Sequence, residues 1–295
     1  MRDTDVTSLH RFDEIENLLT QAKTGRRDLF SDKDFTARLA DRLDRMLDGD
    51  RILSMDIFDT LVLRDNSSEI TRFYEIGGKM ADLATSHTGR DIAQVDAFVA
   101  RHLGTKATYR ASGKIRGCRE GSLLEIHATA SRILTGGGEM SSPFVEAELE
   151  YESARIEPNP FLVDYAARHR ARGGRVVLLT DMYMHAEQVT QLLNLLGISS
   201  KQYDFLLSSA DTKVSKASGG IFRNMQEEMQ AAPGEFVHIG DSFRGDVAQP
   251  IRQGWQALHL PLAQADILER RKDHAKTATM LRETFNVDID IAMPK

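Results

Sequence analysis

Three short apolar runs of the chain have the pattern of buried strands, and each ends in a reactive side chain. The runs lead into Asp56, Thr180 and Asp241, and Lys213 and Lys216 lie between the second run and the last. In open parallel sheets, ligands bind just beyond the carboxyl ends of the strands, so we expect these groups to converge at one edge of a sheet. A carboxylate nucleophile, a hydroxyl, an ammonium group and metal-binding acids together indicate a site for phosphoryl transfer.

Strand and helix patterns alternate from residue 158 onward. Strands are predicted at 176–179, 205–207, 236–239 and 257–260, interleaved with helices at 161–171, 186–196, 221–229 and 247–253. This rhythm predicts an α/β fold whose core is a Rossmann-like parallel sheet with helices on both faces. A first strand ends at Asp56, and residues 69–155 show helical periodicity with few strand signals.

These patterns divide the chain into four parts. We expect an N-terminal helical extension at 1–50, a core at 51–66 and 158–262, a helical insertion at 67–157 and a C-terminal helical tail at 263–295. Apolar residues at helical spacing over 9–47 predict two amphipathic helices in the extension. These helices either pack against the sheet or the insertion, or form a homodimer surface, as the insertion could also do, and the pattern does not choose.

Two motifs carry a resemblance to a known family. Residues 55–61 (Met-Asp-Ile-Phe-Asp-Thr-Leu) resemble the first motif of the haloacid dehalogenase (HAD) superfamily, in a bacterial branch where it reads Phe-Asp-Ile-Phe-Asp-Thr-Leu. Residues 180–184 (Thr-Asp-Met-Tyr-Met) are similar to that branch's second motif, as are the segments at 148–151 and 158–160 before it. The resemblance covers about residues 50–260. It implies that the insertion is a helical cap, which excludes water from the site when it closes.

The resemblance also implies a role for each reactive residue. Asp56 is expected to be the nucleophile that forms an aspartyl-phosphate, and Lys216 to neutralise the charge of the phosphoryl group, with Lys213 as the alternative lysine. Side chains expected beside the substrate are Thr60, Thr180, Asp181 and Lys213. Mg²⁺ is expected as the cofactor, and its expected ligands are Asp56, the backbone carbonyl of Phe58, Asp241 and Asp246. Asp181 is expected to be a structural or water-facing side chain more than a catalytic one. His238 is expected to be a packed core histidine.

Position 58 departs from the family pattern. HAD phosphatases usually carry a second aspartate two residues after the nucleophile, as a general acid and base worth roughly 10²–10⁴-fold in rate. Phe58 stands there instead, so the usual acid and base is missing unless Asp59, where glycine is usual, Asp181 or a cap residue substitutes for it. The departure predicts weak activity on substrates with poor leaving groups.

The amino-acid composition limits the partners and the cellular location that we expect for the protein. The net charge of -6 argues against a primary role in binding nucleic acid or anionic membranes. The single cysteine, Cys118, excludes an intramolecular disulfide and suits a reducing compartment. The start is polar, and no run approaches the roughly 18 apolar residues of a membrane span. We therefore expect a cytoplasmic protein whose partner is a small phosphorylated substrate.

Three functions are compatible with these residues. The favoured one is a Mg²⁺-dependent phosphohydrolase or phosphotransferase of the phosphatase type, with a sugar phosphate or nucleotide sugar as the substrate suggested by analogy. The second is a metal-independent dehalogenase, because dehalogenases also carry an aromatic residue where Phe58 stands. The third is a non-catalytic regulatory module that binds phosphate. Metal dependence separates the first from the second, and turnover separates the first from the third.

Overall fold

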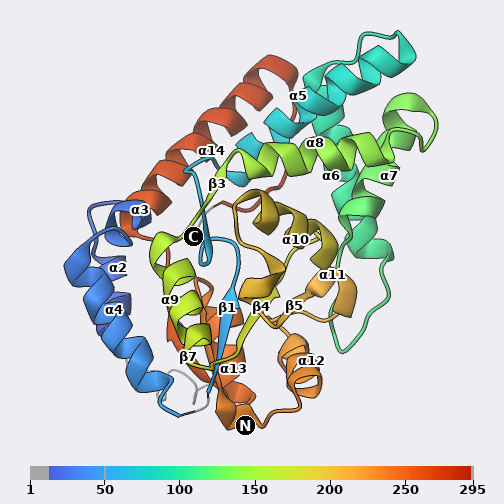
Figure 1. The fold of residues 1–295 in the computed structure, drawn as a ribbon. Coiled ribbons are helices and arrows are strands. Elements are labelled where there is room, and N and C mark those ends of the chain that lie inside the picture. The colour runs from blue at the N-terminus through green and yellow to red at the C-terminus, as the bar shows by residue number, and fades with distance from the viewer. Residues whose placement is uncertain (1–12, 50, 294–295) are drawn as a thin grey trace. The chain divides into compact units, whose positions relative to one another are not determined.

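The computed structural model describes residues 13–49 and 51–293, which form two compact units (Figure 1). The sheet unit contains the described residues up to Arg64, together with Lys114–Cys118 and Ile156–Asp266. The helical unit contains Asp65–Gly113, Arg119–Arg155 and the described residues from Ile267 onward. In the described part of the chain, no helix is both long and apolar enough to cross a membrane.

A five-stranded parallel sheet forms the centre of the sheet unit, in the order β5-β4-β1-β6-β7. The strands are β1 (Ile52–Asp56), β4 (Val176–Thr180), β5 (Phe205–Ser208), β6 (Phe236–Gly240) and β7 (Gln256–His259). The segments between them are α9 (Pro160–Ala171), α10 (Ala186–Leu195), η1 (Ser200–Gln202), α11 (Ser209–Thr212), α12 (Gly220–Met229), η2 (Pro233–Glu235), η3 (Phe243–Ala248) and α13 (Gln249–Arg252). The predicted Rossmann-like α/β fold is therefore confirmed.

Every residue of β1, β4 and β6 is buried, which is why these strands appear in the sequence as largely apolar runs. Phe236 on β6 stacks on Trp255, with ring centroids 4.0 Å apart, and Phe222 of α12 meets the same indole edge-on. Burying one such side chain stabilises the fold by roughly 1.5–3 kcal/mol. The apolar cluster therefore packs α12 against the sheet beside the first residues of β1 and β6.

Two features of the sheet unit differ from the prediction. The helix predicted at 247–253 instead begins as a π-helix, η3, and continues as α13. A short antiparallel pair, β2 (Val62–Arg64) and β3 (Ile156–Pro158), was not predicted. Strands of three residues are too short to show an alternating pattern, and these two partners are far apart in the sequence.

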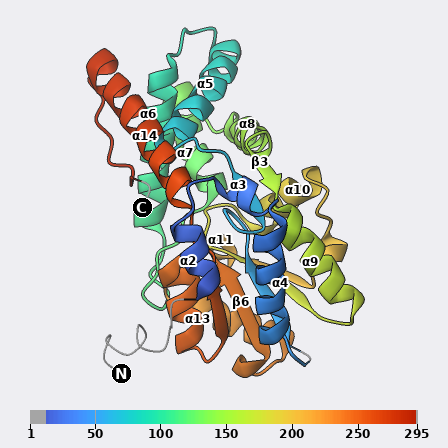
Figure 2. The ribbon, with the colours of Figure 1, turned by 90° about the vertical axis from the view of Figure 1, so that its left-hand side faces the viewer.

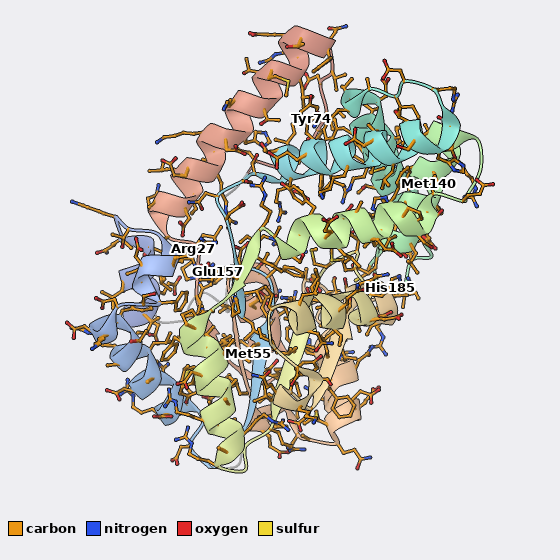
Figure 3. The ribbon with its side chains drawn as sticks, turned by 45° about the horizontal axis from the view of Figure 1, so that its top comes forward. Arg27, Met55, Tyr74, Met140, Glu157 and His185 are labelled. Carbon is orange, nitrogen blue, oxygen red and sulfur yellow. The ribbon has the colours of Figure 1, made fainter. Side chains whose placement is uncertain are left out.

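Residues 13–49, the described part of the N-terminal segment, form three helices where two were predicted for the segment, and they lie together along the sheet unit (Figure 2). They are α2 (Glu14–Thr20), the single turn α3 (Arg26–Leu29) and α4 (Lys33–Met46). Leu9 and Phe12 of the predicted first helix lie outside the described residues. Ile15, Leu19 and Leu39 are almost fully buried. Arg27 and Glu157 form a surface ion pair of 2.7 Å between α3 and β3 (Figure 3). The segment therefore packs within the sheet unit.

The helical unit is built from α5 (Glu69–Thr88), α6 (Gln94–Ala111), α7 (Leu123–Thr135), α8 (Ser141–Ser153) and most of α14 (Gln264–Phe285). Four of these helices, α5 to α8, lie within residues 69–155, where the sequence shows helical periodicity. Gly104 allows α6 to approach α7, because a Cβ there would lie 2.4 Å from the backbone oxygen of Ile126.

A fully buried charge cluster lies inside the helical unit. The carboxylate of Glu148 accepts hydrogen bonds from Arg101 Nε at 2.7 Å and from His127 Nε2 at 2.9 Å. The guanidinium of Arg101 lies 3.6 Å from the ring centroid of Phe73. None of the three charged or polar side chains is exposed to solvent.

Candidate active site

Residues from the carboxyl ends of β1, β4 and β6 and from the loop after α11 line one pocket of about 300 Å³. The lining residues are Asp56, Phe58, Asp59, Arg64, Thr180, Asp181, Met182, Lys216, Ala217, Asp241, Ser242, Arg244, Gly245 and Asp246. Thr180, the last residue of β4, is almost completely buried where it lines the pocket. Lys213 is not in the lining. It ends α11 in a left-handed backbone conformation, with φ of 57°.

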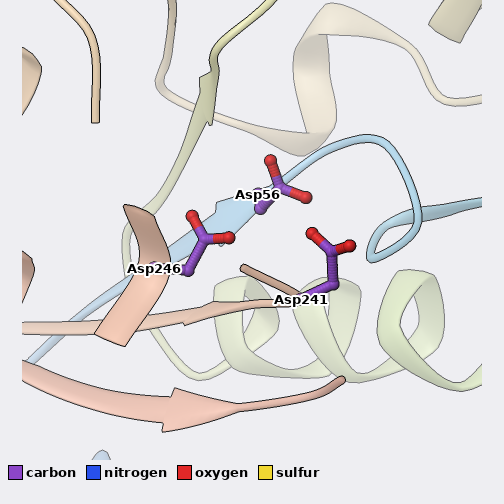
Figure 4. A group of neighbouring side chains, drawn as sticks. All are labelled: Asp56, Asp241 and Asp246. Carbon is purple, nitrogen blue, oxygen red and sulfur yellow. The ribbon is translucent and has the colours of Figure 1, made fainter. Parts of the chain in front are cut away.

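Three carboxylates meet in this pocket, those of Asp56, Asp241 and Asp246 (Figure 4). One oxygen of each lies within 4.8 Å of the others. Asp56 ends β1, Asp241 follows β6, and Asp246 lies in the π-helix behind it. Gly240 permits this arrangement, because a Cβ there would lie 2.3 Å from Asp246 Cγ. The acids that the sequence predicts to converge therefore do so.

Lys216 is the lysine of the site. Its ammonium Nζ lies 2.5 Å from Asp56 Oδ1 and 2.7 Å from Asp246 Oδ1. The carboxylate of Asp181 holds the lysine's backbone by accepting hydrogen bonds from the N–H of Lys216 at 2.6 Å and of Ala217 at 3.2 Å. In this geometry Asp181 positions the lysine loop at the rim of the pocket.

Asp246 is held by several donors besides Lys216. Its Oδ1 accepts from His238 Nε2 at 3.0 Å, and its Oδ2 accepts from the backbone N–H of Ser242 at 2.9 Å. A carboxylate only accepts, so Nε2 carries the ring proton of a neutral imidazole, and Nδ1 accepts from Ser54 Oγ at 2.8 Å. Burial lowers the pKa of His238, which keeps the ring neutral. The buried histidine thus fixes the orientation of Asp246.

The charges of the cluster do not balance. Burial raises the pKa of Asp56 to about 6, although the Lys216 ammonium opposes the shift. Burial, followed by the negative charges of Asp56, Asp59 and Asp246, raises the pKa of Asp241 well above its usual range. Burial also acts to raise the pKa of Asp246, but Lys216 and His238 outweigh it, so this pKa is lowered. The cluster therefore holds more potential negative charge than the single lysine neutralises.

A divalent cation fits this arrangement. Mg²⁺ prefers a few carboxylate oxygens supplemented by carbonyls and water. Asp56 Oδ2 is buried and has no hydrogen-bond partner among the described residues, and the carboxylates of Asp56, Asp241 and Asp246 lie close together. A cation beside these oxygens would offset their mutual repulsion. Lys216 alone does not neutralise the three carboxylates.

Asp59 and Arg64 form a second charged pair in the pocket. Arg64 Nη1 donates to Asp59 Oδ2 at 3.3 Å, and its guanidinium lies 4.3 Å from the ring centroid of Phe58. Asp59 has φ of 60°, a conformation that favours glycine but that aspartate tolerates better than most residues. Arg64 was not predicted as a site residue. It is the last residue of β2, and its closeness in sequence to Asp56 is the only signal that could have identified it.

Thr60 does not line the pocket, and its contact with the substrate stays a prediction. Its side chain is fully buried, and its carbonyl accepts a hydrogen bond from Asn159 Nδ2 at 3.1 Å. The side chain of Asn159 also accepts from the N–H of Leu162 and so caps α9. The backbone of Thr60 is thus held in the turn that follows β1.

A family model described as a haloacid dehalogenase-like hydrolase matches residues 51–248. Among curated proteins, no sequence matches the chain. One similar solved structure is a HAD family enzyme from Bacteroides thetaiotaomicron in complex with magnesium and inorganic phosphate, at 15% identity and a TM-score of 0.47, covering 72% of this chain and 94% of that one. Another is the L-2-haloacid dehalogenase from Xanthobacter autotrophicus with chloropropionic acid covalently bound, at 14% identity and a TM-score of 0.46, covering 81% and 89%.

Proposed function

The chain belongs to the haloacid dehalogenase-like hydrolases, and we propose that it is a Mg²⁺-dependent phosphohydrolase or phosphotransferase that works through an aspartyl-phosphate. We place it in the bacterial branch whose first motif reads Phe-Asp-Ile-Phe-Asp-Thr-Leu. The observation that carries the proposal is the group of three carboxylates at the strand ends, two of which pair with Lys216. A dehalogenase has no need of so much buried negative charge, because its reaction requires no metal.

The proposed reaction has two displacements at phosphorus. A carboxylate oxygen of Asp56 attacks the phosphoryl group, and the bond to the leaving oxygen breaks with its electron pair on that oxygen. In a hydrolase, water then attacks the aspartyl-phosphate, releases phosphate and restores Asp56. In a phosphotransferase, a second substrate's hydroxyl takes the place of water. Because the pKa of Asp56 is about 6, the carboxylate is mostly ionised at neutral pH and can act as the nucleophile.

The other residues of the pocket stabilise the transferred group. Lys216 and the hydroxyl of Thr180 would bind phosphoryl oxygens, and both lie at the same sheet edge as Asp56. Mg²⁺ would be held by Asp56, Asp241 and the backbone carbonyl of Phe58, and it would supply neutralisation of the phosphoryl charge. Asp246, whose oxygens already accept from Lys216, His238 and Ser242, would contribute chiefly by positioning the lysine.

The residues that follow the nucleophile, Phe58 and the Asp59–Arg64 pair, limit the choice of substrate. Phe58 cannot protonate a leaving oxygen. Asp59 Oδ2 already accepts a hydrogen bond from Arg64, which suits a group that takes a proton from water better than one that gives a proton. The proposed enzyme therefore acts best on phosphates whose leaving group departs without protonation. Arg64 and Arg244, which also line the pocket, would favour a substrate body that carries negative charge, such as a nucleotide sugar or an acidic sugar phosphate.

The test is phosphate release from sugar phosphates, nucleotides and a series of aryl phosphates of decreasing leaving-group pKa, with Mg²⁺ and with EDTA. We expect turnover only with Mg²⁺, and we expect the rate to rise steeply as the leaving group improves. Asp56→Asn should lower kcat by about 10⁴-fold or more. Halide release from a haloacid in EDTA would contradict the proposal in favour of a dehalogenase. Phosphate binding without turnover on any substrate would favour a regulatory module.

A further inference from the structure

Two hydrogen bonds through His259 connect helix α2 to the backbone of Asp241, whose carboxylate is a proposed metal ligand. His259, the last residue of β7, has Nδ1 2.9 Å from Glu16 Oε1 and Nε2 2.9 Å from the backbone oxygen of Asp241. Both side chains are more than nine-tenths buried. The ring of Phe243, two residues beyond Asp241, meets the imidazole edge-on at 5.6 Å.

The direction of these hydrogen bonds follows from the groups involved. A carbonyl oxygen has no proton, so His259 Nε2 must donate to Asp241. One further proton is then shared between Nδ1 and the carboxyl group of Glu16. A rigid ring fixed at both nitrogens defines where the backbone of Asp241 lies, and the backbone in turn decides where its carboxylate can point.

Glu16 and His259 lie outside the range that the family model matches. Glu16 precedes residue 51, and His259 follows residue 248. The connection therefore joins two residues outside the matched range, one on α2 and one on β7.

We propose that Glu16 and His259 are positioning residues that orient Asp241 for the divalent cation, so that the N-terminal segment completes the metal site. The inference rests on the Mg²⁺ site of the proposed function. Groups that orient metal ligands in this way typically change metal affinity or activity 10–100-fold when removed.

The experiment is calorimetric titration of the full chain with MgCl₂, without substrate, so that it does not depend on turnover. Glu16→Ala and His259→Gln should each weaken Mg²⁺ binding by about 10-fold or more. The double variant should show little further loss, because both changes interrupt the same connection. Glu16→Gln, whose amide can donate to Nδ1, should restore affinity to within about threefold of the wild type. Glu14→Ala is the matched control on the same helix, because Glu14 is exposed and pairs with Arg38 at the surface.

The outcomes separate the two proposals. If the wild type binds Mg²⁺ and Glu16→Ala and His259→Gln bind it equally well, the positioning role is wrong and the proposed function stands. Losses that add fully in the double variant would also contradict a shared connection. If the wild type binds no Mg²⁺, the metal-dependent function fails, and the inference fails with it. Should Glu16→Ala not fold, His259→Gln against the wild type decides the question alone.

Discussion

Two clusters of charged side chains among the described residues, one in each unit, differ in how their charges are compensated. In the helical unit, Glu148 meets Arg101 and His127, and burial, which by itself raises the pKa of Glu148, is outweighed by these partners, so that the pKa falls below its ordinary value. In the sheet unit, three carboxylates lie together and two of them, Asp56 and Asp246, pair with Lys216, while the pKa values of Asp56 and Asp241 rise.

The difference separates a structural cluster from a functional one. Burying charge is unfavourable unless the partners neutralise it and satisfy its hydrogen bonds. In the helical unit, Arg101 neutralises Glu148 and both carboxylate oxygens accept hydrogen bonds, so this carboxylate is compensated internally. The sheet unit leaves negative charge uncompensated beside a pocket, which is the arrangement that a cationic cofactor would complete. Perturbed ionisation is therefore informative about function mainly when its direction indicates a missing partner.

Glu148→Ala should produce the largest change in stability. It leaves the guanidinium of Arg101 buried without its carboxylate, and breaking such a pair typically costs about 3–5 kcal/mol. Urea unfolding with and without Mg²⁺ should show the same loss in both conditions. Glu150→Ala on the same helix is the control, because its exposed pair with Lys79 should contribute less than about 1 kcal/mol. Recovery of Glu148→Ala by Mg²⁺ would show that the two clusters are not distinct in the way described.

Lys216→Met should produce the next largest loss of stability. Unlike the loss in Glu148→Ala, this loss should depend on Mg²⁺. Removing the ammonium leaves Asp56 and Asp246 facing each other, and we expect a loss of about 2–4 kcal/mol in EDTA. Mg²⁺ should recover part of this loss because it supplies positive charge to the same oxygens. Lys213→Met, a nearby lysine outside the pocket, should leave stability within about 0.5 kcal/mol of the wild type in both conditions.

Asp241→Asn should stabilise the metal-free protein. The change removes a carboxyl group whose pKa is raised by burial and by neighbouring acids, so we expect a gain of about 1–2 kcal/mol in EDTA. The same variant should lose most of the stabilisation that Mg²⁺ gives the wild type. A loss of stability in EDTA would mean that Asp241 is already compensated within the protein.

The pH dependence of stability should have opposite signs in the two clusters. Asp56 has a folded-state pKa of about 6 against an ordinary 3.8, so its contribution is present below about pH 4 and lost as the pH rises to 6. Asp56→Asn should therefore gain on the wild type over that window in EDTA, by at most about 1.4 kcal/mol per pH unit. Glu148 has a lowered pKa, so its contribution is present above about pH 4.5 and lost as the pH falls. Glu148→Gln should approach the wild type in acid.

Much of the active site could be predicted from the sequence because its residues sit at strand ends. Asp56, Thr180 and Asp241 each follow a fully buried strand, and buried parallel strands are recognisable as continuous apolar runs. The strand order does not need to be known for such residues to converge. The choice between Lys213 and Lys216 did need the structure, because both follow the same short helix and only one reaches Asp56.

The residues that the sequence did not reveal are those brought in by pairing between distant segments. Arg64 reaches the pocket because β2 pairs with β3, a contact between residues on either side of the helical insertion. Glu16 reaches the site because α2 packs beside the end of β7. No local pattern marks either residue, since a single charged side chain on a short element looks like any solvated position.

Local chemistry thus determined the class of fold and the nature of the site: apolar runs of strand length, each ending in an acid or hydroxyl, suffice to specify a parallel sheet with a charged edge. Tertiary structure alone decided how those charges are balanced. The net charge of a buried cluster depends on which distant side chains come within hydrogen-bonding distance, and burial amplifies each such contact. A single carboxylate paired with an arginine therefore differs from three carboxylates beside one lysine in its need for a cation, and α2 is linked through His259 to the backbone of Asp241.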